Sequence, residues 1–80
     1  MKTYESAIKY LAKEETEIRR VYDAKQSNYL AGAYEISDAI DNQLHGMMQA
    51  QSEHVRMVAY IYDKPTNTVY RDMSAQANQQ

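Results

Sequence analysis

A row of polar side chains in the middle of the chain has residue types and spacing that could bind a metal ion or transfer protons. The row consists of Glu35, Asp38, Asp41, Asn42 and His45. Steps of three and four residues place side chains on one side of a helix, and a carboxylate four residues from an imidazole can hold a divalent metal with it. Zinc sites need at least three protein ligands, whereas this chain has 2 His and no Cys. We therefore predict an acidic helix surface without a metal.

The second histidine, His54, lies beside Glu53 and could act as a general base. The nucleophile that it would activate is missing, because the chain has no cysteine and no serine in a Gly-x-Ser-x-Gly setting. Neither of the 2 glycines belongs to a phosphate-binding loop. The sequence therefore predicts no catalytic residues, no cofactor and no enzymatic activity.

Basic and aromatic residues alternate along the first third of the chain, a pattern that can bind nucleic acid through charge and stacking. These residues are Lys9, Lys13, Arg19, Arg20 and Lys25, with Tyr10 and Tyr22 between them. Three glutamates, Glu14, Glu15 and Glu17, interrupt the run, and the total net charge of −2 provides no basic field. We expect no direct binding of nucleic acid.

The middle third of the chain is a separate acidic segment. Residues 26–55 include no lysine or arginine, and their charged residues are Glu35, Asp38, Asp41 and Glu53. Such a surface repels phosphates and favours basic partners. These four carboxylates form a candidate acidic binding face.

Tyrosine is the only aromatic residue type, with 8 Tyr and no Phe or Trp, and there are 5 Met. Every buried ring therefore brings a hydroxyl that needs water or a hydrogen-bond partner. Tyr, Met and Arg are enriched at protein interfaces. The last third of the chain carries a group of such residues that we predict to bind another protein: Arg56, Tyr60, Tyr62, Tyr70 and Arg71.

Two helices account for most of the chain. Over about residues 4–26, apolar and charged residues recur at alternating steps of four and three: Tyr4, Ile8, Leu11, Glu15, Ile18, Tyr22, Lys25 and Tyr29. This spacing predicts an amphipathic helix, with Thr3 as its N-cap. Residues 26–28 suggest a break, and a second, antiparallel helix is expected over about 28–52, continuing through Gly46. One uninterrupted rod is the alternative.

The pattern changes character from Val55 onward. Residues 55–62 alternate and are rich in β-branched and aromatic side chains, and Asp63-Lys64-Pro65-Thr66-Asn67 is typical of a turn. We predict a β-hairpin that pairs residues 56–63 with 66–73, and hence an α+β fold. The alternative is an all-α helical hairpin or three-helix arrangement, with helices separated by Pro65.

The apolar content is small for an independent domain. Eighty residues make one small domain, expected over 1–73, with a disordered polar tail over 74–80. Since there are no disulfides, we expect a homodimer, with the second strand of the hairpin meeting its symmetry mate in a four-stranded sheet. The longest apolar run, 57–62, is too short to span a bilayer, so no membrane partner is expected and a cytoplasmic location is predicted.

These features together favour interaction over catalysis. The predicted function is that of a non-catalytic protein-binding regulatory or accessory factor, such as a small phage or mobile-element protein that inhibits a host protein by occupying its surface. The alternative is an acidic antagonist that mimics nucleic acid and targets a nucleic-acid-handling protein.

Overall fold

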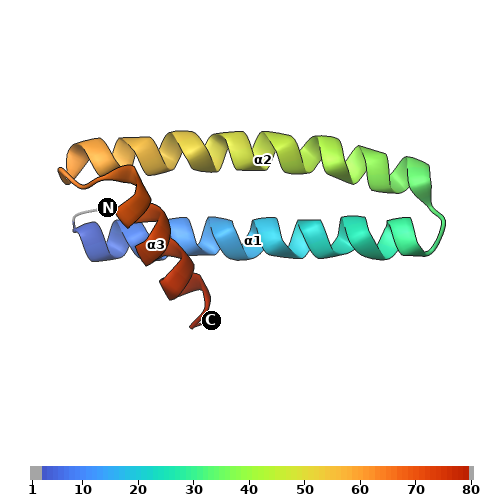
Figure 1. Cartoon of the computed structure of the whole chain (residues 1–80), viewed down its shortest axis with the longest axis horizontal. Helices are drawn as coiled ribbons and strands as arrows, with labels where there is room; N and C mark the ends of the chain where they lie inside the picture. Colours follow the sequence, from blue (N-terminus) through green and yellow to red (C-terminus); the bar gives the residue numbers. More distant parts are fainter. Residues whose placement is uncertain (1–2, 80) are drawn as a thin grey trace.

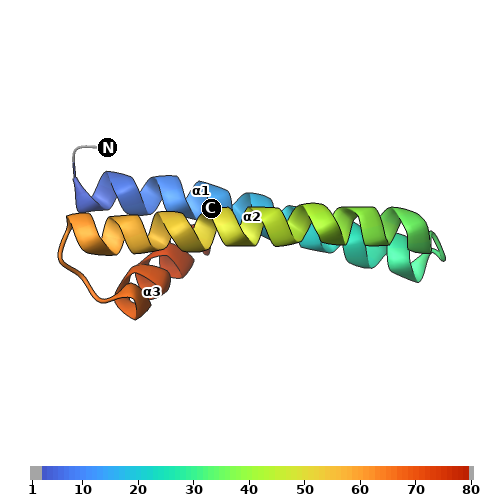
Figure 2. The same cartoon turned by 90° about the horizontal axis from the view of Figure 1, so that it is seen from above.

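The computed structural model describes residues 3–79, which form three helices and no strand. Helices α1 (Tyr4–Leu30) and α2 (Tyr34–Ile61) are antiparallel, and α3 (Thr66–Ala77) crosses α1 near the end of the pair where α1 begins (Figure 1). The other half of the pair has no third helix against it, and the molecule measures 45 × 23 × 19 Å (Figure 2). Residues 1, 2 and 80, which belong to the predicted domain and tail, lie outside the described residues.

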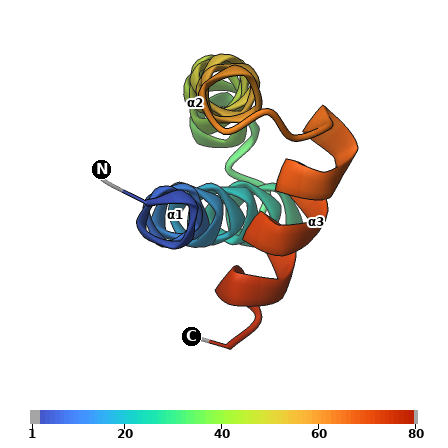
Figure 3. The ribbon, with the colours of Figure 1, turned by 90° about the vertical axis from the view of Figure 1, so that its left-hand side faces the viewer.

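Helix α3 covers only one side of the α1–α2 pair. Seen along the pair, α3 lies to one side of the plane through the two long helices, and no helix of residues 3–79 covers the opposite side (Figure 3). We call this opposite side the open face. We call the end of the pair where α1 turns into α2 the distal end.

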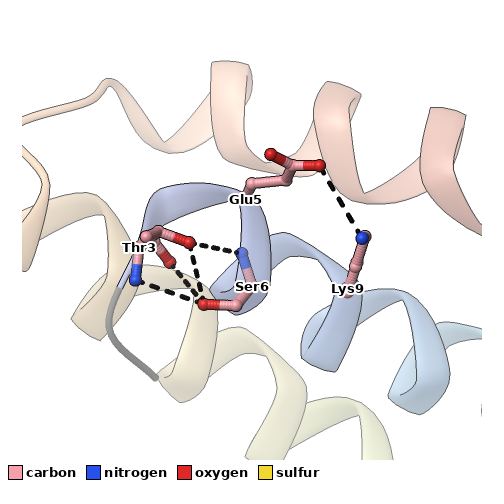
Figure 4. A network of polar contacts seen from close by, with 4 residues as sticks. All are labelled: Thr3, Glu5, Ser6 and Lys9. Carbon is pink, nitrogen blue, oxygen red and sulfur yellow. Dashed lines mark hydrogen bonds and ion pairs between the residues drawn. The ribbon is translucent and has the colours of Figure 1, made fainter.

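The start of α1 is fixed by a capping box. The Oγ1 atom of Thr3 accepts a hydrogen bond from the Ser6 N–H at 3.1 Å, and the Ser6 hydroxyl oxygen accepts one from the Thr3 N–H at 3.2 Å (Figure 4). Glu5 lies in the first turn, 3.7 Å from Lys9, and its negative charge interacts favourably with the positive end of the helix dipole. The predicted Thr3 cap is confirmed.

The seam predicted for α1 is the surface that faces α2, and its apolar members Ile8, Leu11 and Ile18 are buried. The two charged seam positions have partners on α2. The Glu15 carboxylate accepts a hydrogen bond from the Gln51 amide at 3.3 Å, and the Lys25 ammonium lies 2.8 Å from Asp41. Polar pairs within a helix seam specify its register, because a shift would leave their charges unpaired.

The break predicted at residues 26–28 is wrong, because α1 continues to Leu30. The chain turns away from the helix at Gly32, whose φ of 82° lies in the left-handed region that glycine adopts without strain. Its N–H donates to the carbonyl of Tyr29 at 3.0 Å, and the next N–H donates to the carbonyl five residues before it at 2.9 Å. This is a Schellman motif. Gly46 lies inside α2, as predicted.

The predicted β-hairpin and the α+β fold are wrong, because both expected strands are helical, and the three-helix alternative is the observed arrangement. Val55, Val58 and Ala59 recur with helical spacing and are buried in the core shared with α1. Burial on one face outweighs the strand preference of β-branched residues, which is weak and depends on context. Since residues 3–79 contain no strand, the expected pairing of two copies through a sheet has no edge to use.

The turn residues that suggested a hairpin end one helix and start the next. Asp63 has a φ of 52°, its N–H faces the carbonyl of Tyr60 at 3.4 Å, and the Lys64 N–H donates to the carbonyl of Ala59 at 2.9 Å. This is a second Schellman motif, with aspartate in the left-handed position. Pro65, with a φ of −62°, then precedes α3. The turn chemistry was predicted correctly, but its place was assigned to the wrong kind of element.

Helix α3 closes the core at the end of the pair where α1 begins, opposite the distal end. It contributes Val69, Met73 and Ala77 at steps of four, and all three are buried. The helix thus continues past residue 73 into the stretch that was expected to be a polar tail. The Tyr4 hydroxyl donates to the Asp72 carboxylate at 2.6 Å, and burial, together with this bond, raises the pKa of Tyr4 to about 12.

Candidate functional site

The five residues predicted to bind a partner lie on α2, on α3 and in the turn between these helices. Tyr60 and Arg56 lie on the outer side of α2, and Tyr60 is 89% exposed. Tyr62 follows α2 and packs its ring edge-on against Tyr4, with 5.7 Å between the ring centres. Its ring is therefore part of the contact between α1 and the end of α2.

The two members on α3 also make contacts within the chain. The Tyr70 hydroxyl donates to the hydroxyl of Ser52 on α2 at 3.3 Å, which places Tyr70 about one turn from Arg56 along α2. Arg71 lies 3.7 Å from Asp72. Four members of the predicted group are exposed, and Tyr62 is partly buried.

The predicted acidic face is divided as well. Lys25 donates to Asp41, and this hydrogen bond lowers the pKa of the Asp41 carboxyl and raises that of the Lys25 ammonium. Glu53 lies 18 residues beyond Glu35 on the same helix, a distance of about 27 Å. Glu35 and Asp38, both exposed near the distal end, are the part of the acidic face that forms a local group.

The candidate metal and acid–base residues have other partners. His45 lies 3.8 Å from one oxygen of Asp41, whose other oxygen is bound by Lys25. Across residues 3–79, no group of three or more acidic, histidine or cysteine side chains is arranged to hold a metal ion. The Nδ1 atom of His54 lies 2.8 Å from the carboxylate of Glu14 on α1, so the partner of His54 is Glu14 rather than the adjacent Glu53.

A cluster of exposed apolar side chains lies at the distal end, and the sequence analysis missed it. We call it the tip: Tyr29, Leu30, Tyr34 and Ile36, whose exposed fractions are 57%, 84%, 58% and 56%. The turn at Gly32 brings the end of α1 and the start of α2 together (Figure 1), and these side chains remain exposed. Apolar pairs on both sides of a helix-ending glycine are the sequence signal that could have revealed it.

The tip is held in place by contacts on both sides of the turn. The rings of Tyr29 and Tyr34 meet edge-on with 5.3 Å between centres. The Ser37 hydroxyl donates to the carbonyl of Lys25 at 3.1 Å, one turn before the Lys25–Asp41 pair ties the helices together. A surface that is already ordered loses less conformational entropy when a partner binds.

A second candidate surface lies on the open face. A groove between α1 and α2 holds a cavity of about 200 Å³ that is lined by Tyr10, Leu11, His54, Met57, Val58 and Ile61. It continues along Met47 and Ala50 toward the middle of the pair. Apolar side chains from both helices line this groove, and such surfaces are typical of sites where proteins interact.

Searches of protein-family models, of curated protein sequences and of solved structures give no match to this chain. Within residues 3–79, no helix combines the length and the apolar character that crossing a bilayer requires. The tip and the open face are therefore the features on which a functional proposal can rest.

Proposed function

We propose that this chain is a non-catalytic protein-binding factor that acts by inserting its tip into an apolar site on another protein. The observation that carries the proposal is the exposure of the four large tip side chains, which the fold does not use in its core. Clustered exposed apolar side chains mark interaction surfaces in water-exposed proteins. A regulator that occupies a surface in this way needs no catalytic group.

The charge around the tip indicates what kind of site would accept it. Glu35 and Asp38 flank the apolar side chains, and residues 26–55 carry no lysine or arginine. A basic rim around an apolar pocket would match this pattern and speed association. Opposite charge on the partner thus supplies orientation, while burial of the tip supplies most of the affinity.

The acidic antagonist has less support as an alternative. Its four carboxylates would need to present a continuous negative surface, yet Asp41 is neutralised by Lys25 and Glu53 lies about 27 Å from Glu35. The remaining pair, Glu35 and Asp38, is a small charge cluster for a surface that imitates a phosphate backbone, which carries a charge about every 1.7 Å.

A capture experiment with matched variants tests the proposal. The tagged wild-type chain and the double variant Leu30→Ser, Tyr34→Ser are used to capture partners from cells of the source organism. Tyr60→Ser serves as control, because Tyr60 is more exposed than either tip residue but lies outside the tip. Both substitutions at the tip should leave the helix content unchanged, because exposed side chains contribute less than about 0.5 kcal/mol to folding. We expect the tip variant to lose the partner and the control to keep it.

Photocrosslinking separates contact from indirect effects. A photoreactive amino acid replacing Tyr34 should crosslink to the captured protein, and the same group at Tyr60 should not. Retention of the partner by the tip variant, with loss on Glu35→Lys and Asp38→Lys, would favour the acidic antagonist. Equal capture by all variants would remove the tip from consideration.

A further inference from the structure

Helix α2 carries a second helix-packing stripe against which no third helix of residues 3–79 packs. Met47, Ala50, His54, Met57 and Ile61 follow one another at steps of three, four, three and four along the open face. This is the heptad spacing by which helices pack in bundles. The first stripe of α2, through Leu44 and Val58, already packs against α1, so the second one is available for another helix pair.

The molecule exposes more surface than a compact chain of its mass. Its accessible surface is 5608 Å², whereas a folded monomer of 9.3 kDa is expected to expose about 5,000 Å². The radius of gyration is 14.4 Å, against about 11.6 Å for a compact domain of this length. The excess of roughly 600 Å² belongs to the whole elongated hairpin, of which the open face is one side, and a stable interface buries ~800 Å² of each partner.

The charges on the open face balance one another within one chain. Lys13 and Glu14 both line the groove, and Glu17 is paired with Arg20 one turn further along α1, so that two basic groups offset two acidic ones. A face with a strong net charge would repel its own copy, because like charges oppose each other across a two-fold axis. This face carries no such penalty, and the small side chain of Ala50 at its centre allows helices to approach closely.

We propose that the open face binds a second copy of this chain, so that two helical hairpins form a symmetric dimer with a four-helix core. Helix α3 lies on the opposite side of each hairpin and does not obstruct the contact (Figure 3). Burial of Tyr10, Met57 and Ile61, which are exposed in the single chain, is the main stabilising contribution. The tip lies at the distal end and stays accessible in the dimer, so this interface is independent of the proposed function.

Sedimentation equilibrium of the purified full chain tests the dimer. The wild type should sediment at about twice its 9.3 kDa mass at concentrations on the order of 100 µM. Met57→Glu places a carboxylate in the interface and should raise the dissociation constant at least about tenfold. The matched control is Met48→Glu, because Met48 has a similar exposure, 49% against 59%, but lies on the other side of α2.

Ile61→Glu, at a second exposed position of the same stripe, repeats the test if Met57→Glu lowers the helix content. Dissociation by the open-face variants alone supports the proposal. A monomeric wild type overturns it, as does a dimer that Met48→Glu weakens as much as Met57→Glu. A dimer that separates on Leu30→Ser also overturns it, because the interface would then be the tip.

Discussion

Replacement of Met73 by alanine is the sharpest test of how α3 holds the fold together. Met73 is 2% exposed, and its sulfur accepts a hydrogen bond from the Gln51 amide at 3.4 Å. Truncation of a buried methionine costs about 2–5 kcal/mol, through lost burial and the cavity left behind. A chain of 80 residues is stable by only about 4–12 kcal/mol, so this single change removes a large share.

Urea unfolding followed by circular dichroism measures the effect, at one protein concentration for all variants because association shifts apparent stability. We expect Met73→Ala to lower the free energy of unfolding by at least about 2 kcal/mol and the midpoint of thermal unfolding by about 8 °C or more. Met48→Ala, at a half-exposed site, should change stability by less than about 0.5 kcal/mol. A loss below about 1 kcal/mol for Met73→Ala, or equal losses for both, would refute the packing of α3 described above.

Further predictions concern the backbone and the titrating groups. Gly46→Ala should stabilise α2 by about 0.5–1 kcal/mol, since the added Cβ meets no atom within 4 Å. Gly32→Ala should lower the free energy of unfolding by about 1–2 kcal/mol, because alanine is strained at a φ of 82°. Urea unfolding that shows changes of the same sign for both variants would contradict this. The pKa of Tyr4, about 12, predicts stability that is complete below pH 10 and is lost between pH 10 and 12; ultraviolet titration should show one late phenol that Asp72→Asn shifts toward 10. The lowered pKa of Asp41 predicts stability that is present above pH 3.8 and lost as the pH falls below it; a carboxyl midpoint at or above 3.8 by NMR would contradict the ion pair.

The α1 seam was predictable because its pattern is local and repeats over seven turns. Thr3 and the steps of four and three specify a helix whatever it packs against. What the pattern could not show was the use of Glu15 and Lys25. Each appeared to weaken the seam, yet each meets a polar partner on α2 that lies 36 or 16 residues away in sequence.

The prediction failed at residues 55–73, where short patterns of period two and period 3.6 overlap. Val55 and Val58 suit a strand by propensity and a helix by spacing, and Asp63 with Pro65 can close a hairpin or end a helix. The choice depends on whether α1 offers a complementary surface. It does, through Ile8 and its neighbours in the core.

The candidate surfaces show the same division. The sequence showed that the middle segment is acidic and has no lysine or arginine. It did not show that Lys25 neutralises Asp41, because that ion pair joins two helices. The exposure of Leu30 was also hidden, since an apolar residue at the end of a helix is normally expected in a core.

The sequence alone determined the start of α1, its seam, the turn at residues 63–65 and the sign of the charge in each segment, because these depend on neighbours within a few residues. The tertiary structure alone decided that residues 55–61 are helical, which polar seam positions pair, and that the tip and the open face remain uncovered. The physical reason is that burial is a property of contacts between distant segments, and no local pattern records which partner each apolar face will find.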